Sequence, residues 1–350
     1  MKRDTALSIA GITRHQYYYH PRKNRRGRKP VDTTLRVDGC IVENCPNNQV
    51  VKKIKEIQND PDTDYGYRKM TFALMALGYL INHKKVYRLM YEHQLLKDKM
   101  QKPSREFVKF RRVIPERPLQ ILEMDIKFTW VEEHRRHAFI LTIIDTFTRV
   151  VLGWQVAYQM KQELVKQLWQ NVIENHLQPC DCLNRQMQIE IRNDNDRRFV
   201  AHSVQRFFKE NQLSQVFTHP YTPQENGHIE SFHAILSQKL NRYCFWSLAD
   251  LEKCLTLFYE KYNNHRLHSA ILYLPPMVFW HCWEQSLVET KLDDKRRKVK
   301  HRLTIPYHQL SGNMNLREVP CSQPKTLDGL EDEKMKKEMY GAETFQQPSV

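Results

Sequence analysis

The stretch Ile121-Leu122-Glu123-Met124-Asp125-Ile126-Lys127-Phe128-Thr129-Trp130 decides the fold class. Every even position in it is apolar, whereas the odd positions are mostly polar or charged. Successive side chains of a β-strand point to opposite faces, so this alternation predicts a half-buried strand with Asp125 on its polar face.

Two apolar runs, Ala138 to Ile144 and Val150 to Trp154, follow that strand too closely for helices to intervene. The three segments therefore predict an antiparallel meander. A helical stripe over 164–173 and a second alternating strand over 187–192 then imply a parallel crossover. Asp194 lies just past the end of that second strand, in phase with its polar side, where sites in such sheets form.

A helix with the apolar stripe Ile229, Phe232, Leu236 and Leu240 follows a loop rich in turn-forming residues. Glu230 lies about a quarter turn from this stripe, at the rim of the buried face. At this rim a carboxylate can face a groove without exposing the core.

Asp125, Asp194 and Glu230 thus come from two polar strand faces and a helix rim. Hard oxygen ligands of this kind suit two Mg²⁺ ions about 4 Å apart, which activate an attacking hydroxyl and stabilise the leaving oxygen in phosphodiester displacement. Taken singly, each carboxylate is more often a solvated or capping group. The set of three indicates a site more strongly than any one member.

The net charge is +15, from 55 Lys and Arg against 40 Asp and Glu. Three segments carry the excess: residues 1–30 (+8), 97–117 (+5) and 291–302 (+5). This distribution favours a polyanionic partner. A hydrophobic content of 41% is too high for a wholly disordered chain, so a globular basic protein is predicted.

Composition and periodicity divide the chain into five parts. They are a basic N-terminal arm (1–46), a helical DNA-binding-like domain (47–96), a basic linker (97–118), the core (119–283), and a basic run with a mobile tail (284–350). The helical part reads as three short helices, the third opening with His83-Lys84-Lys85-Val86-Tyr87-Arg88. It resembles a helix-turn-helix, with a small bundle bearing an ordinary solvated basic face as the alternative.

Further motifs follow one another in order. They are Glu123-Met124-Asp125-Ile126 with Ile144-Asp145-Thr146-Phe147-Thr148-Arg149, then Arg192-Asn193-Asp194-Asn195, Pro223-Gln224-Glu225-Asn226-Gly227-His228-Ile229-Glu230, and Tyr262-Asn263-Asn264-His265-Arg266. Thirty-five residues separate Asp194 from Glu230. With these motifs, residues from about Leu119 to Phe279 resemble the catalytic core of DDE transposases and retroviral-type integrases, specifically the orfB-type transposases of bacterial insertion sequences.

The resemblance implies a ribonuclease-H-like α/β fold, a mixed five-stranded sheet with flanking helices, preceded by a small all-α helix-turn-helix-like domain. It also implies metal-dependent DNA strand cleavage and strand transfer during transposition. Asp125 would bind both Mg²⁺ ions, Asp194 one and Glu230 the other, with Mn²⁺ as a substitute. Asp145 matches a common family position, but it ends a buried strand and we interpret it as structural.

The expected partners are the element ends and target DNA, a second copy of the chain on that DNA, and a first-frame protein supplied by frameshift fusion. The candidate DNA contacts are Arg25, Arg26, Arg28, Lys29, Lys84, Lys85, Arg88, Gln224, His228 and His233. For Gln224 and the two histidines, ordinary helix-surface polarity is the alternative interpretation.

The chain departs from the family pattern at Asp194-Asn195-Asp196, where relatives usually have Gly two residues after the second Asp. The change removes a permissive turn residue and adds a charge. Asp196 is an alternative ligand, but only 33 residues separate it from Glu230, so we keep Asp194. The altered turn motivates an alternative function, a catalytically impaired DNA-binding protein derived from a transposase. A ribonuclease H is a third and weaker reading.

The sequence has no apolar stretch approaching 18 residues and no sufficient apolar segment at its start. Its eight cysteines are far below disulfide-scaffold density. We therefore expect a bacterial cytoplasmic protein that associates with the nucleoid and not with membranes.

Overall fold

The structure is a computed structural model that describes residues 3–19, 30–39, 41–63, 65–97, 113–183, 187–218, 226–293 and 298–313. Its centre is a five-stranded mixed sheet of order β6-β5-β4-β7-β8. The strands are β4 (Ile121–Val131), β5 (Arg136–Asp145), β6 (Val151–Ala157), β7 (Ile189–Asn193) and β8 (Leu213–Phe217). β4 to β6 pair antiparallel, and β7 and β8 run parallel to β4, so the predicted meander and crossover are confirmed.

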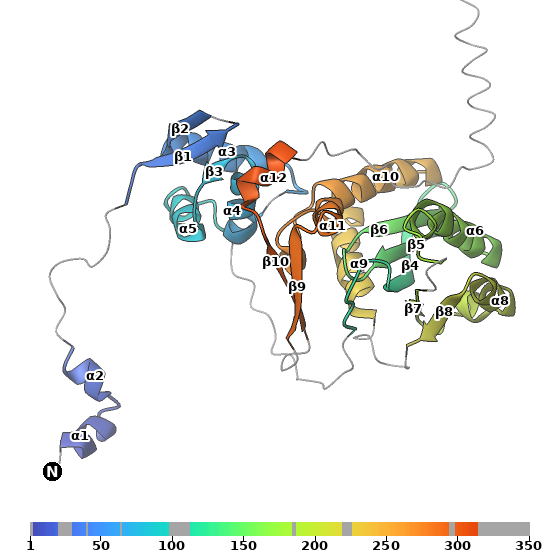
Figure 1. Cartoon of the computed structure of the whole chain (residues 1–350), viewed down its shortest axis with the longest axis horizontal. Helices are drawn as coiled ribbons and strands as arrows, with labels where there is room; N and C mark the ends of the chain where they lie inside the picture. The colour runs from blue at the N-terminus through green and yellow to red at the C-terminus, as the bar shows by residue number, and fades with distance from the viewer. Residues whose placement is uncertain are drawn as a thin grey trace, which may run out of the picture.

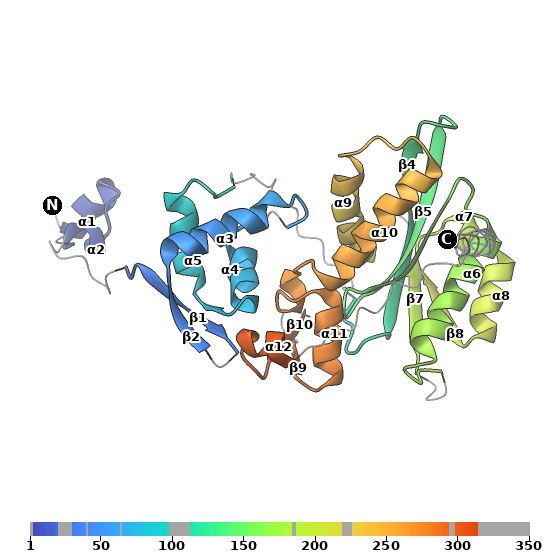
Figure 2. The same ribbon diagram turned by 90° about the horizontal axis from the view of Figure 1, so that it is seen from above.

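Helices cover both faces of the sheet (Figure 2). The even side of β4, with Leu122 and Met124, packs on α6 (Gln162–Val172) and α8 (His202–Glu210). The opposite side packs on α9 (Gly227–Leu240) and α10 (Leu248–Asn264). The expectation of a half-buried strand therefore needs correction in the first half of β4, where Glu123 has 0% exposure.

The helical part is formed by α3 (Asn47–Asn59), α4 (Tyr67–Ala76) and α5 (His83–Glu92), as the sequence predicted. Val50, Ile54, Met70, Leu74 and Val86 make its core and are all completely buried. Asn82 begins α5 by accepting a hydrogen bond from the Lys85 amide at 2.9 Å.

A three-stranded sheet of order β2-β1-β3 adds to the helical part. Its strands are β1 (Thr33–Asp38), β2 (Ile41–Pro46) and β3 (Tyr79–Leu80). The sequence placed residues 31–46 in a basic arm, and the structure differs by forming a hairpin there. The Val37 amide donates to the Gly78 carbonyl at 2.9 Å, which joins the hairpin to the helical part.

Residues 269–313 continue the fold beyond α10. They form η3 (Ser269–Ile271), α11 (Pro276–Glu284), the hairpin β9 (Val288–Asp293) and β10 (Lys298–Leu303), and α12 (Tyr307–Asn313). Figures 1 and 2 both place α11, the hairpin and α12 between the helical part and the sheet. The segment predicted as a basic run followed by a mobile tail (284–350) forms regular structure as far as residue 313, because Val288 and Leu310 join an apolar cluster with Phe279.

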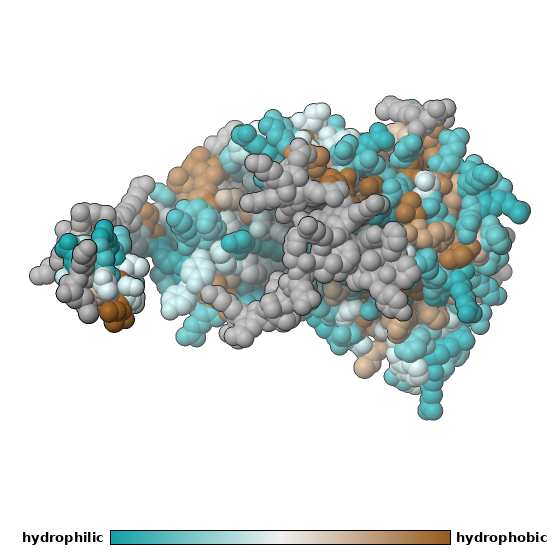
Figure 3. Space-filling view, turned by 90° about the horizontal axis from the view of Figure 1, so that it is seen from below, coloured by the Kyte–Doolittle hydropathy of each residue, from teal (hydrophilic) through white to brown (hydrophobic). Residues whose placement is uncertain are grey.

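The remaining helices are short. They are α1 (Arg3–Ile9), α2 (Arg14–Tyr17), η1 (Ile173–Leu177) and α7 (Arg197–Val200). Within the ranges that the structure describes, no helix is long and apolar enough to cross a bilayer. Seen from below, the part of the surface over the main sheet is predominantly hydrophilic with small hydrophobic areas (Figure 3).

Candidate active site

Asp125 lies in the middle of β4, with its side chain 26% exposed. One of its oxygens, Oδ2, is 3.2 Å from Nδ1 of His233 on α9. The other, Oδ1, accepts a hydrogen bond from the Ile126 amide at 2.7 Å. The strand alternation that predicted a polar odd face thus brings this carboxylate against the helix that carries Glu230.

Asp194 follows the end of β7 and is exposed. Partial loss of hydration raises the pKa of its carboxyl group, and the negative charges of Asp125 and Asp196 raise it further. Glu230, in the first turn of α9, is also exposed. Its pKa is raised by partial loss of hydration, then by the charges of Asp125 and Glu123.

Strand β4, which carries Asp125, pairs with β7, whose end precedes Asp194, and Asp125 contacts His233 of α9, the helix that also carries Glu230. The three sequence-predicted residues therefore come from adjoining elements. Their donor chemistry fits a hard divalent cation, since all are oxygen ligands whose mutual repulsion a cation would relieve. Among the described residues, however, no group of three or more His, Cys, Asp or Glu side chains is close enough to form a metal site.

The turn after β7 forms without glycine. Asp196 accepts hydrogen bonds from the Arg198 amide at 2.9 Å and from Nε of the same residue at 2.7 Å, and it begins α7. The Asn195 side chain donates to the Thr218 carbonyl at 3.0 Å. None of residues 194–196 has a positive φ, so a glycine is not required at this turn.

The Asp196 carboxylate forms an ion pair with Arg198. The Arg198 side chain lowers the pKa of the Asp196 carboxyl through a hydrogen bond, whereas the pKa of the Asp194 carboxyl is raised. Asp145 is buried and accepts hydrogen bonds from the Leu119 and Thr148 amides and from the Thr148 hydroxyl. These contacts give Asp145 the structural role that we predicted for it.

Glu123 is a carboxylate that the sequence analysis did not single out. It accepts a hydrogen bond from the Ile229 amide at 2.7 Å, and its other oxygen is 2.9 Å from Nδ1 of His228. Burial raises its pKa to about 7. Because Asn226 makes no side-chain cap at the start of α9, Glu123 satisfies a backbone donor there from β4. The sequence signal was its position two residues before Asp125, on the same strand face.

His228 and His233 both contact carboxylates of β4, Glu123 and Asp125, which with Glu230 and Asp194 are called the carboxylate cluster below. His228 contacts Glu123, and His233 is 7% exposed beside Asp125. Nε2 of His233 is buried without a hydrogen-bond partner within the described part of the chain. Both histidines therefore contact the carboxylate cluster, and Gln224 lies outside the described residues.

The candidate DNA contacts on α5 differ in their surroundings. Lys84 is exposed, whereas Lys85 donates to the Thr33 carbonyl of the hairpin at 2.6 Å. Arg88 is 3.7 Å from Glu92. The four basic residues of the N-terminal run, Arg25, Arg26, Arg28 and Lys29, lie outside the described residues.

A mixed five-stranded sheet of this order, with helices on both faces, defines the ribonuclease-H-like class of α/β proteins. Family comparisons agree with it. Two models described as integrase core domain match residues 115–223 and 211–276, and a model described as HTH-like domain matches residues 46–103.

Two relatives extend the comparison. A putative transposase of insertion sequence element IS150 from Escherichia coli K12 is 23% identical over 292 residues, covering 79% of this chain and 92% of the relative. A protein of insertion element IS476 from Xanthomonas euvesicatoria is 27% identical over 217 residues, covering 61% of this chain and 60% of the relative. The chain is therefore similar to insertion-sequence transposases, and residues 115–276 match the integrase core domain.

One solved structure among those similar to the chain is the catalytic core domain of bovine immunodeficiency virus (BIV) integrase. It is 20% identical, covers 48% of this chain and 97% of that chain, and superposes with a TM-score of 0.36. This overlap is too loose to support a conclusion about function.

Proposed function

We propose that the chain cleaves DNA at element ends and joins them to target DNA, with Asp125, Asp194 and Glu230 holding divalent metal ions. The observation that supports the proposal is that three carboxylates come from adjoining elements: Asp125 from β4, Asp194 from the end of the neighbouring parallel strand β7, and Glu230 from the first turn of α9, whose His233 contacts Asp125. When bound, two Mg²⁺ ions would supply activation of the attacking hydroxyl and stabilisation of the leaving oxygen.

The protein's own residues supply positioning. His233 holds Oδ2 of Asp125, which limits the rotation of that carboxylate. Glu123 fixes the N-terminus of α9, one residue before Glu230, by accepting the Ile229 amide hydrogen. The chain would thus present three oxygen ligands from one rigid strand, one strand end and one anchored helix to the DNA phosphate.

The expected partners are DNA at the element ends and in the target, a second copy of the chain on DNA, and a first-frame protein supplied by frameshift fusion. The exposed Lys84 on α5 supports the first of these, since basic side chains on such a helix contact phosphates and bases. The other two partners are carried over from the family resemblance.

The test uses purified full-length protein, Mg²⁺ and DNA carrying the terminal repeats, with strand cleavage and strand transfer read on gels. We expect Asp194→Asn and Glu230→Gln each to lower both rates by about 10²–10³-fold, the loss typical when a group stabilising charge in the transition state is removed. The matched control is Asp196→Asn, which should keep its rate within about threefold because Arg198, not the reacting centre, occupies that carboxylate.

Unchanged activity in Asp194→Asn or Glu230→Gln would refute the assigned roles. The alternative, a DNA-binding protein without catalysis, requires salt-sensitive binding to the ends with no nicking in Mg²⁺ or Mn²⁺. The sequence favours this alternative because the turn after Asp194 lacks a glycine. None of residues 194–196 has a positive φ, so the missing glycine is no argument against catalysis.

A further inference from the structure

A basic cavity of about 270 Å³ lies where the helical part meets α9 and α10. Tyr65 and Lys69 line it from the helical part, and Lys239, Arg242 and Arg266 line it from the core side. Tyr65 makes the junction itself, because its hydroxyl accepts a hydrogen bond from the Leu267 amide at 3.3 Å. The cavity is separate from the carboxylate cluster, although α9 contributes to both.

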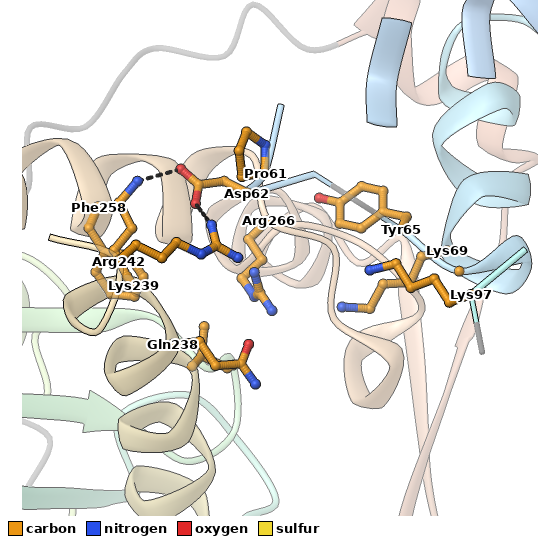
Figure 4. Close-up of a pocket in the computed structure, with 12 residues that line it drawn as sticks. Pro61, Asp62, Tyr65, Lys69, Lys97, Gln238, Lys239, Arg242, Phe258 and Arg266 are labelled. Carbon is orange, nitrogen blue, oxygen red and sulfur yellow. Dashed lines mark hydrogen bonds and ion pairs between the residues drawn. The ribbon is translucent and has the colours of Figure 1, made fainter. Parts of the chain in front are cut away.

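Five basic side chains and one carboxylate line this cavity. The carboxylate is Asp62, which is already engaged: its Oδ2 is 2.8 Å from Lys239 and its Oδ1 is 3.5 Å from Arg242. Figure 4 shows Asp62 turned toward these two residues, while Lys69, Lys97 and Arg266 point into the space beside them.

Lys69 and Arg266 face the cavity without a compensating charge. Neither forms an ion pair with a carboxylate in the described ranges, and Nε of Arg266 is buried there with no hydrogen-bond partner. Burial, followed by the charges of Arg266 and Lys97, lowers the pKa of Lys69 to about 8. Like charges gathered at one place are unfavourable unless an anion neutralises them.

We propose that this cavity binds a phosphate of the DNA backbone, so that one DNA strand contacts the helical part and the core at the same point. The inference rests on the proposed function, because it assumes that DNA is the substrate. The size fits, since about 270 Å³ lies below the roughly 300–1,000 Å³ of pockets for drug-sized ligands and suits a phosphate better than a whole nucleotide. Arg266 presents a planar fork and Lys69 a point charge, the two chemistries that proteins use for phosphate.

Salt dependence of DNA binding tests the proposal. Fluorescence anisotropy would follow the full chain binding a terminal-repeat duplex in EDTA, from 50 to 200 mM salt. We expect Lys69→Gln and Arg266→Gln each to reduce the magnitude of the salt slope by about one and to weaken binding roughly fivefold at 0.15 M salt. The matched control is Lys209→Gln, which removes the same charge from an exposed site on α8, on the far side of the sheet.

A second arm titrates inorganic phosphate by calorimetry against the same variants. Loss of affinity for inorganic phosphate with an unchanged duplex slope would make the cavity a site for a free anion and would overturn the DNA assignment. Slopes equal to that of Lys209→Gln in both cavity variants would also overturn it. Because EDTA prevents cleavage, these readouts do not depend on catalysis: a chain that binds as expected and never cuts contradicts the proposed function and leaves the cavity assignment standing.

A third measurement covers the case in which Lys69→Gln or Arg266→Gln does not fold. Wild-type protein would be acetylated briefly at pH 8 with and without duplex, and labelled lysines quantified by mass spectrometry. Protection of Lys69 by duplex, with Lys209 unchanged, supports the proposal. Equal labelling of Lys69 in both samples refutes it.

Discussion

Single side chains decide the electrostatics of this protein. Glu123 and Asp125 stand two residues apart on the same face of β4, yet one is completely buried and caps a helix while the other is partly exposed. The position of Asp125 on a polar strand face was predictable from alternation alone. The role of Glu123 was not, because it depends on α9 packing over the strand, and no local pattern contains that contact.

Lys69 gives a prediction about stability. Its pKa is about 8 in the folded protein and 10.5 ordinarily, so the folded state disfavours its charged form. Below pH 8 this buried charge lowers the free energy of unfolding by its full amount. Between pH 8 and 10.5 the unfolded chain binds more protons than the folded protein, so stability rises with pH and the loss disappears. Lys69→Met should therefore raise the Tm of the DNA-free protein by a few degrees at pH 7.

Calorimetric melting at pH 7 and at pH 10 checks this prediction. The difference between Lys69→Met and wild type should shrink at the higher pH. Lys209→Met, at an exposed position on α8, serves as the reference and should change Tm little at either pH. A lower Tm for Lys69→Met at pH 7 would show that packing of the stem outweighs the buried charge.

The elements of the core were predictable where periodicity was strong, as in β4, β7, α6 and α9. The hairpin of β1 and β2 was not, because each of its strands has only one buried residue, Thr34 in β1 and Cys45 in β2. A strand that buries one side chain carries no alternating signal in its sequence. The motif over residues 262–266 also has a structural role: the Asn263 side chain accepts a hydrogen bond from the Val151 amide and donates one to the Val151 carbonyl, both at 2.9 Å.

Gly78 lies against the hairpin of β1 and β2, so a substitution there tests how firmly the hairpin is held. Its φ is +88°, and a Cβ added there would lie 2.1 Å from the Val37 carbonyl oxygen. Gly78→Ala should cost at least about 2 kcal/mol in the free energy of unfolding, because strain and a backbone clash act together. Gly39 also has a positive φ, +59°, but a Cβ added there would meet nothing within 4 Å. Gly39→Ala should therefore lower the free energy of unfolding by about 1–2 kcal/mol, from backbone strain alone.

Urea unfolding followed by far-UV circular dichroism measures both variants. The expected order is wild type, Gly39→Ala, then Gly78→Ala in decreasing stability. Equal losses for the two would mean that the hairpin moves away from Gly78 without cost, and that the Val37 contact does not hold it in place.

At the scale of the whole molecule, the helical part and the core meet through both apolar and charged contacts. Phe72 of α4 stacks on Tyr273 with ring centroids 4.2 Å apart, and Asp62 binds Lys239 and Arg242 across the junction. The order of the domains was predictable from composition. Their contact was not, because Asp62, Lys239 and Tyr273 lie far apart in the sequence and nothing local links them.

A double-mutant cycle of Asp62→Asn and Lys239→Met measures the charged part of that junction. Both side chains are mostly buried, at 20% and 15% exposure, so we expect a coupling of about 1–2 kcal/mol, above the value for surface pairs. The exposed pair Lys53 and Glu56 on α3 is the matched control and should give a clearly smaller coupling, because solvent screens it. Equal couplings in the two cycles would contradict the expected contribution of this junction.

Helix α9 holds Glu230 in its first turn and Lys239 near its end. Nine residues of helix separate them by about 14 Å, and a helix of this length behaves as a stiff rod. A tilt of about 5° about the Asp62 contact would shift Glu230 by about 1 Å, a displacement that can cost an enzyme about a hundredfold in rate. If the chain acts as proposed, the contact between the helical part and α9 also aligns Glu230, and a variant that loosens this contact would cleave DNA slowly even with Asp125, Asp194 and Glu230 intact.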